Sequence, residues 1–172
     1  MKKLISVLIC IVLALGIFAS CGKESAPKAA PLAEVYASLE QVTNMPAMEI
    51  MPDALIETLF GFDLSKFEEY VFAEAADPSV NADTIILVKL KDSADLTATC
   101  DVLDSYLYSV KENTQSYSPV NFAKTQKSAV SVIDQNYIYL IITSEYAEAE
   151  QVIIEAIQLG HTDSVIQTLV EN

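Results

Sequence analysis

The sequence predicts an α+β domain in two layers, with an antiparallel sheet of about four strands and helices packed on one face. Two pairs of β-rich segments lead to this fold class: residues 67–75 with 84–90, and residues 129–133 with 137–143. Strands that are adjacent in the chain and joined by short connections pair antiparallel. A helical apolar stripe follows each pair, which gives the order ββαββα and places helices against the sheet.

Two further helices are expected before the first strand. Residues 32–42 carry apolar side chains at helical spacing. Residues 54–60 are apolar at intervals that suit a short helix, and Gly61 stands where a left-handed C-cap belongs. Residues 45–51 fit neither a helix nor a strand clearly, and residues 63–66 form one turn at most.

The two later helices have the clearest patterns. The first runs from an N-cap at Ser93 to about Asn113, and its apolar residues step by four and three. The second covers residues 145–158, with Ser144 as its cap and Gly160 after its end. Turns or loops are expected at 77–81, 116–119 and 134–136, and a further helical turn or two at 163–170.

The first 21 residues have the composition of a targeting segment. Two lysines precede an apolar run, Leu4 to Phe18, whose length of about 15 residues is short of the roughly 20 that span a bilayer. Two small residues then precede Cys21. The resulting Phe-Ala-Ser-Cys sequence resembles the lipobox of bacterial lipoproteins, although Phe18 stands where Leu is usual.

This resemblance implies a division of the chain into three parts. Residues 1–20 would be a lipoprotein signal peptide that is removed after diacylglyceryl transfer to the Cys21 thiol. Residues 21–31 would be the lipidated Cys21 and a flexible tether. The ten residues after Cys21 would reach roughly 33–36 Å when fully stretched. Residues 32–172 would form a single domain. An ordinary secretory signal cut near Ala19 and a retained membrane helix are the alternatives.

The charge of the chain restricts its partners. All ten basic residues are Lys, against 24 acidic residues, so the formal charge is −14. Nucleic-acid binding needs clustered positive charge, and we therefore expect no nucleic-acid partner. Loss of the signal peptide would leave eight Lys and a charge of −16. Such a protein favours cationic or neutral partners and is mildly repelled by anionic lipid headgroups.

Residues 51–70 and 136–142 carry a second resemblance. Together with residues 84–91 and the long helix after them, they are similar to a family of small lipoproteins from Firmicutes that is classified only as a domain of unknown function. The resemblance covers about residues 32–157. It implies an extracytoplasmic lipoprotein on the outer face of the cytoplasmic membrane, and it supplies no catalytic residues.

Neither a metal site nor a cofactor is expected. Asp101 and Asp104 lie on one helix face, but hard cations need six or more oxygens from a convergent loop. Met45, Met48 and Met51 recur at a spacing that can bind Cu(I), although packing in the core or in a loop is the simpler interpretation.

No catalytic residues are predicted either. Glu68 and Glu69 are adjacent on an expected strand and would point to opposite faces. Cys100 lies on an apolar stripe, which predicts a buried and unreactive thiol. The single histidine, His161, follows a helix end and is expected in an exposed loop, so no Cys–His pair is indicated.

Three functions remain open for such a domain. The leading hypothesis is a non-enzymatic binding or interaction module of the cell envelope, acting on an envelope protein or a small ligand. Tyr106, Tyr108 and Tyr117 could form its binding patch. A hydrolase would need two carboxylates with raised pKa values in a deep pocket. A structural or assembly factor would act through a sheet edge or the tyrosine patch, and it would show a flat apolar patch instead of a pocket.

Overall fold

A five-stranded antiparallel sheet in the order β1-β2-β3-β5-β4 forms the centre of the molecule. The computed structural model describes residues 28–160. The strands are β1 (Met48–Ile50), β2 (Phe67–Ala75), β3 (Thr84–Leu90), β4 (Val130–Ile133) and β5 (Tyr137–Ile142). The predicted α+β class and antiparallel pairing are confirmed, and the ambiguous segment at 45–51 supplies β1, a fifth strand at one edge.

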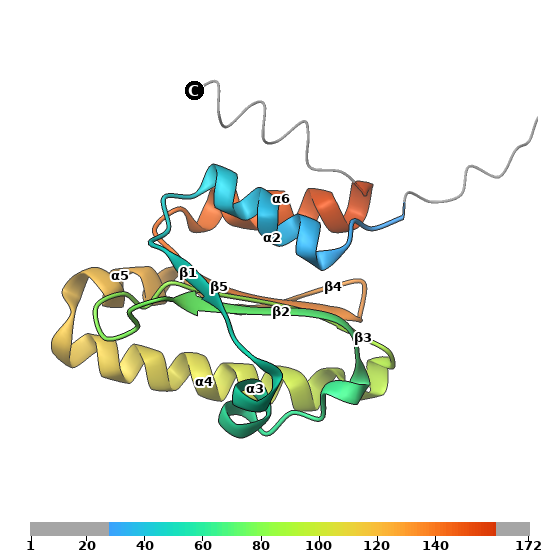
Figure 1. Ribbon diagram of the computed structural model, residues 1–172, viewed down its shortest axis with the longest axis horizontal. Coiled ribbons are helices and arrows are strands. Elements are labelled where there is room, and N and C mark those ends of the chain that lie inside the picture. Colours follow the sequence, from blue (N-terminus) through green and yellow to red (C-terminus); the bar gives the residue numbers. More distant parts are fainter. Residues whose placement is uncertain (1–27, 161–172) are drawn as a thin grey trace, which may run out of the picture.

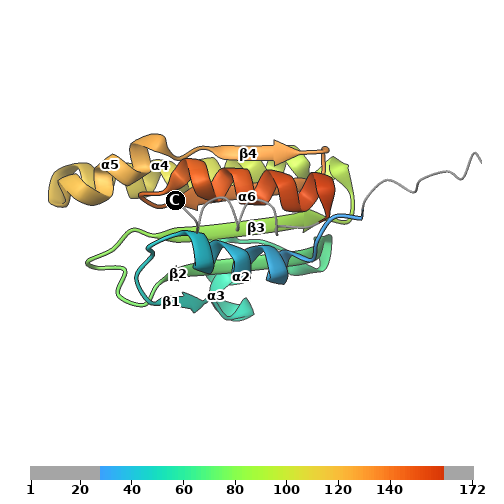
Figure 2. The ribbon, with the colours of Figure 1, turned by 90° about the horizontal axis from the view of Figure 1, so that it is seen from above.

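Helices cover both faces of this sheet, so the prediction of helices on one face is wrong. Helices α2 and α6 lie side by side on one face, α3 and α4 lie on the other, and α5 packs against α4 at the end of the sheet (Figures 1 and 2). The helices are α2 (Leu32–Val42), α3 (Asp53–Phe60), α4 (Leu96–Tyr117), α5 (Pro119–Lys127) and α6 (Tyr146–Leu159). Two short 3₁₀ turns, Leu64–Lys66 and Ser93–Asp95, complete the described elements.

The central strands explain why helices cover both faces of the sheet and give the fold three layers. In β3, Ile85 and Leu87 pack against α2 and α6, whereas Ile86 and Val88 face the layer of α3 and α4. All six residues of β5 are buried. Strands that are apolar on both sides must be covered on both sides. A continuous apolar run in the sequence therefore indicates two helical layers.

Helix α5 was not expected, and its sequence explains why. Its segment has a weak apolar stripe, and the sequence predicts a loop at residues 116–119. Instead α4 continues to Tyr117, and the chain turns at Ser118, whose hydroxyl accepts a hydrogen bond from the Asn121 N–H at 3.4 Å. Pro119 then takes the first helical position, which tolerates its missing N–H.

The ends of several elements follow the sequence, and two caps differ. Gly61 and Gly160 take left-handed conformations with φ of 69° and 76°, as C-cap glycines do. Asp92, and not Ser93, caps the turn before α4, because its carboxylate accepts the Ala94 N–H at 2.9 Å. Ser144 does not cap α6; its hydroxyl donates to the neighbouring Glu145 carboxylate.

Several predictions concern residues outside the described range. The signal peptide, the lipobox with Cys21, most of the tether, His161 and the expected turns at 163–170 all belong to this group. Among the helices between residues 28 and 160, none combines the length and the apolar composition that crossing a bilayer requires.

Candidate functional site

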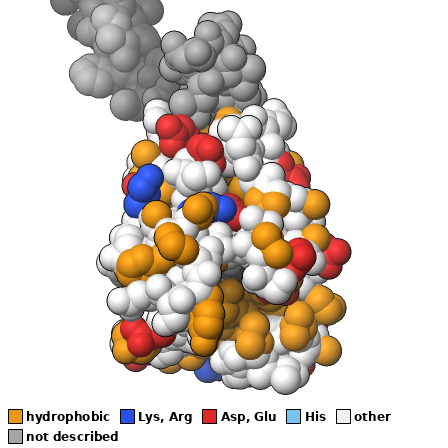
Figure 3. All heavy atoms as spheres, turned by 90° about the vertical axis from the view of Figure 1, so that its left-hand side faces the viewer, with side chains coloured by type: hydrophobic (Ala, Val, Ile, Leu, Met, Phe, Trp, Pro, Cys, Tyr) orange, Lys and Arg blue, Asp and Glu red, His pale blue; other side chains and the backbone are white. Residues whose placement is uncertain are grey.

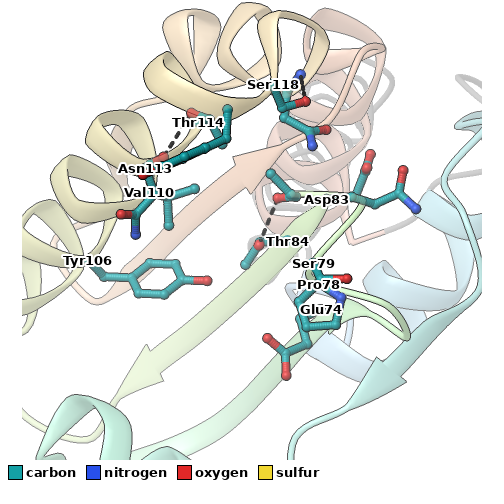
Figure 4. Close-up of a pocket in the computed structure, with 14 residues that line it drawn as sticks. Glu74, Pro78, Ser79, Asp83, Thr84, Tyr106, Val110, Asn113, Thr114 and Ser118 are labelled. Carbon is teal, nitrogen blue, oxygen red and sulfur yellow. Dashed lines mark hydrogen bonds between the residues drawn. The ribbon is translucent and has the colours of Figure 1, made fainter.

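A pocket of about 380 Å³ opens at the end of the sheet where β2 ends and β3 begins. Its floor is formed by these strand ends, and its walls are formed by the loop between them, by α4 and by the start of α5 (Figure 4). This end of the molecule faces the viewer in Figure 3, where the surface is hollowed between apolar side chains. Most of the lining residues carry hydroxyl, amide or carboxylate groups, although the larger part of the lining surface is apolar; the polar residues are Glu74, Ser79, Asn81, Asp83, Thr84, Tyr106, Asn113, Thr114, Tyr117, Ser118 and Asn121.

Helical spacing explains which residues of α4 reach this pocket. Tyr106, Val110, Asn113 and Tyr117 follow each other at intervals of three or four residues, and therefore lie on one face of the helix. Tyr108 comes two residues after Tyr106, which turns it by about 200° in a helix of 3.6 residues per turn. Accordingly its side chain is 66% exposed and does not line the pocket.

Two contacts between α5 and the segment before β3 hold the pocket in shape. The Lys124 ammonium group lies 2.5 Å from the Asp83 carboxylate, and Asp83 is only 1% exposed. The Asn121 amide donates a hydrogen bond of 2.7 Å to the backbone carbonyl of Val80. Together these contacts tie α5 to a loop that has few buried apolar residues of its own.

The carboxylate of Glu74 is the unusual group in this pocket. Glu74 is half-buried near the end of β2, and Glu49 of β1 lies directly opposite it in the antiparallel pair. Burial raises the pKa of the Glu74 carboxyl, and the charge of Glu49 adds to this rise. Within residues 28–160 it forms no hydrogen bond or ion pair. The folded protein therefore favours the protonated form of this carboxyl. The contribution to folding stability is present below the ordinary pKa of the group, and it is lost as the pH rises through the raised pKa.

Tyr106 forms the wall beside Glu74. Its ring packs on Phe60 with 5.0 Å between centroids, so the aromatic cluster below the pocket fixes its position. Burial raises the pKa of its phenol, a hydrogen bond with Thr84 lowers it, and the charge of Glu74 raises it again. In Figure 4 the Tyr106 ring extends from α4 toward the strand ends where Glu74 lies.

The structure divides the tyrosine patch predicted from the sequence. Tyr106 and Tyr117 line the pocket, with Tyr117 on its rim and 88% exposed, whereas Tyr108 lies on another face of α4. Sequence reasoning missed Glu74, because a single carboxylate in a strand carries no motif. It could have been found from the register of β1 and β2, which places two glutamates opposite each other.

The prediction for Glu68 and Glu69 is wrong in its geometry. The pairing of β2 with β3 shifts register between Phe67 and Glu69, so simple alternation does not hold there. The Lys89 ammonium group lies 2.9 Å from the Glu68 carboxylate and 3.7 Å from that of Glu69. Glu69 also accepts the Leu32 N–H at the start of α2, at 2.8 Å. Both glutamates thus serve structural contacts far from the pocket.

The other candidates also have structural positions. Met45 and Met48 pack with the α2 and α6 core, whereas Met51 is buried in the core on the other face, so their sulfur atoms do not converge. Cys100 packs at the edge of that second core. Burial raises the pKa of its thiol, and the charges of Asp104 and Asp101 raise it further, which disfavours the reactive thiolate.

No group of three or more potential metal-binding His, Cys, Asp or Glu side chains occurs within residues 28–160. Asp101 and Asp104 are exposed on α4. Accordingly the site consists of a polar pocket with one unpaired carboxylate, aromatic groups and several amides.

Comparison with known proteins places this fold in a family. The chain has no significant match among curated proteins and none among solved structures. Its match to a protein family covers residues 40–143, from the end of α2 through β5, and so includes the complete sheet and all the residues that line the pocket. The chain belongs to the family described as Domain of unknown function (DUF4358).

Proposed function

We propose that this protein is a lipid-anchored binding module on the outer face of the cytoplasmic membrane, and that the pocket at the end of β2 and β3 holds a small polar ligand. The lipobox sequence before Cys21 supports the anchor. One observation carries the binding function: a half-buried carboxylate, Glu74, has no partner among residues 28–160, in a pocket otherwise rich in hydroxyl and amide groups. Pockets with a few convergent polar groups are the usual small-molecule sites.

The pocket favours binding over hydrolysis. A carboxylate hydrolase needs two convergent carboxyl groups, one with a raised pKa that stays protonated and acts as the acid, and one that stays ionised. Two carboxylates line this pocket, but Asp83 is held by the Lys124 ammonium group, which leaves Glu74 alone. An assembly function through a sheet edge has less support, because the edge strands β1 and β4 have three and four residues.

The end of β2 and the start of β3, which form the floor of the pocket, lie at the opposite end of the molecule from the start of α2 (Figure 1). The Ala30 N–H bonds to the Ala156 carbonyl at 3.0 Å, which ties the N-terminal segment to the end of α6. The Leu32 N–H bonds to Glu69 near the start of β2, whereas the pocket lies at the end of that strand. In a protein anchored at Cys21, the pocket would therefore face away from the side on which the tether joins the domain.

Replacing Cys21 with Ala is expected to abolish lipid labelling and to release the protein or leave it unprocessed. Two acyl chains hold a protein stably because each buried methylene contributes about 0.8 kcal/mol. Metabolic labelling with a fatty acid, mass spectrometry and membrane fractionation measure the result. Cys100→Ser is the matched control and keeps the label, because Cys100 belongs to the folded domain. Unchanged mass and membrane association of Cys21→Ala would contradict the anchor.

A photo-crosslinking amino acid at position 117 tests the binding function in native membranes. Benzoylphenylalanine in place of Tyr117 stands on the rim of the pocket and is expected to capture a small molecule, which mass spectrometry detects as an adduct. The same substitution for Tyr108 is the matched control, since it is also exposed on α4 but faces away. Equal labelling at both positions would contradict a pocket ligand, and protein adducts at position 117 would support the assembly function instead.

A further inference from the structure

We propose that the ligand of this pocket carries a primary ammonium group and that Glu74 is its counter-ion. This inference rests on the proposed binding function and adds the chemical class of the ligand. The carboxylate of Glu74 is half-buried, lines the pocket and has no partner within residues 28–160. A partly desolvated carboxylate without a partner is costly, and a bound cation offsets that cost through charge-assisted hydrogen bonds.

The charges around the pocket exclude an anionic ligand. Among the described residues that line the pocket, Glu74 and Asp83 are the two charged ones, and none is a lysine. Lys124 belongs to α5, and its ammonium group is engaged by the Asp83 carboxylate at 2.5 Å. Glu49 stands opposite Glu74 across the strand pair and adds a second negative charge. The field in the pocket is consequently negative, and it attracts cations.

The small number of convergent acidic groups in the pocket favours an organic cation over a metal ion as the ligand. Calcium requires six to eight oxygen ligands, and magnesium requires near-ideal octahedral geometry. Within residues 28–160 no group of three or more acidic, His or Cys side chains converges. An ammonium group instead needs one carboxylate and gains from an aromatic face within about 6 Å. Tyr106 supplies a ring in the wall beside Glu74, and Tyr117 supplies one at the rim.

The remaining polar groups fit the uncharged part of such a ligand. Asn113 from α4 and Asn81 from the β2–β3 loop line the pocket and offer amide donors and acceptors. The Ser79 hydroxyl lies in the same loop and is already bonded to Asp77 at 2.6 Å. A pocket of about 380 Å³ is large enough for a ligand the size of a blocked amino acid.

Two-dimensional NMR of the full-length chain in neutral detergent micelles tests this inference with two probes. Nα-acetyl-lysinamide carries the ammonium group, and Nα-acetyl-norleucinamide has a similar side chain without it. The lysine derivative is expected to shift the backbone amide signals of Glu74, Thr84 and Tyr106, and to bind at least about tenfold more tightly than the norleucine derivative, which corresponds to about 1.4 kcal/mol.

Glu74→Gln is expected to abolish this preference, lowering the affinity for the lysine derivative about tenfold, while Glu112→Gln retains it. Both variants lose one negative charge, but Glu112 is exposed on α4 and does not line the pocket. Loss of folding is not expected in Glu74→Gln, because the change removes like-charge repulsion with Glu49.

Three outcomes would overturn the ammonium class. Equal binding of both probes at the pocket, unaffected by Glu74→Gln, would show a ligand site without charge selection and would leave the binding function intact. Equal loss in Glu74→Gln and Glu112→Gln would show general attraction to an acidic protein. No response of the pocket signals to either probe would also reject the ammonium ligand, and crosslinking at position 117 would then decide separately whether the pocket binds any ligand.

Discussion

Replacing Lys124 with Met is expected to lower the free energy of unfolding by about 3–5 kcal/mol. The Lys124 ammonium group lies 2.5 Å from the carboxylate of Asp83, which is 1% exposed. Met preserves most of the apolar stem but removes the charge, so the variant leaves a buried carboxylate without compensation. Urea unfolding followed by circular dichroism at 222 nm measures the loss, because the chain contains no Trp for fluorescence.

Two further variants distinguish this ion pair from a general effect of charge. Lys127 is exposed on the same helix and forms no ion pair within residues 28–160, so Lys127→Met is expected to change stability by less than about 0.5 kcal/mol. The double variant Asp83→Asn/Lys124→Met is expected to be more stable than Lys124→Met alone, because it no longer buries an unpaired charge. If Lys124→Met were as stable as Lys127→Met, the pair would have no role in compensating Asp83.

The Asp83–Lys124 pair illustrates what local sequence patterns do not contain. The two residues are 41 positions apart, and neither belongs to a motif. Their contact depends on α5, and hydrophobic periodicity does not predict this helix because its apolar stripe is weak. A capping serine followed by proline, Ser118-Pro119, was the available signal for that helix. The pocket could not be predicted without α5, because α5 supplies part of one wall and holds the adjoining loop.

Elements with strong local signals were predicted well. The strand at 84–90 and the helix at 32–42 have the expected bounds, since their hydrophobic patterns are clear. The strand at 67–75 also has the expected bounds, although its pattern fits a strand only moderately. The hairpin between β4 and β5 was also expected, and Asp134 and Gln135 take positive φ values there, as a tight turn requires. These predictions depended on neighbouring residues alone.

The arrangement of layers required a different kind of inference. Apolar residues on both sides of β3 and β5 indicated that each face of the sheet needs a cover, but the prediction assigned all helices to one face. The tyrosine patch shows the same limit. Helical spacing alone separates Tyr108 from Tyr106 and Tyr117, whereas Glu74 enters the site through the pairing of strands that are distant in sequence.

Replacing Phe72 with Ala is expected to lower the free energy of unfolding by about 3–5 kcal/mol. Phe72 is 1% exposed on β2, and its ring lies 5.2 Å from the Phe60 ring and 6.0 Å from the Phe62 ring, measured between centroids. These contacts fasten α3 and the loop after it to the sheet. Truncation therefore removes a large apolar side chain and leaves a cavity that rigid neighbours fill incompletely.

The same variant is also expected to disturb the pocket, because Tyr106 packs on Phe60 at 5.0 Å between ring centroids. Urea unfolding gives the loss of stability, and NMR shifts at Thr84 and Tyr106 report the change in the pocket wall. Tyr108→Ala is the matched control on α4: its side chain is 66% exposed, so stability should change by less than about 0.5 kcal/mol. If Phe72→Ala lost stability but left the Tyr106 and Thr84 signals unchanged, the aromatic cluster would hold α3 without positioning the pocket, and the link from core packing to ligand binding would fail.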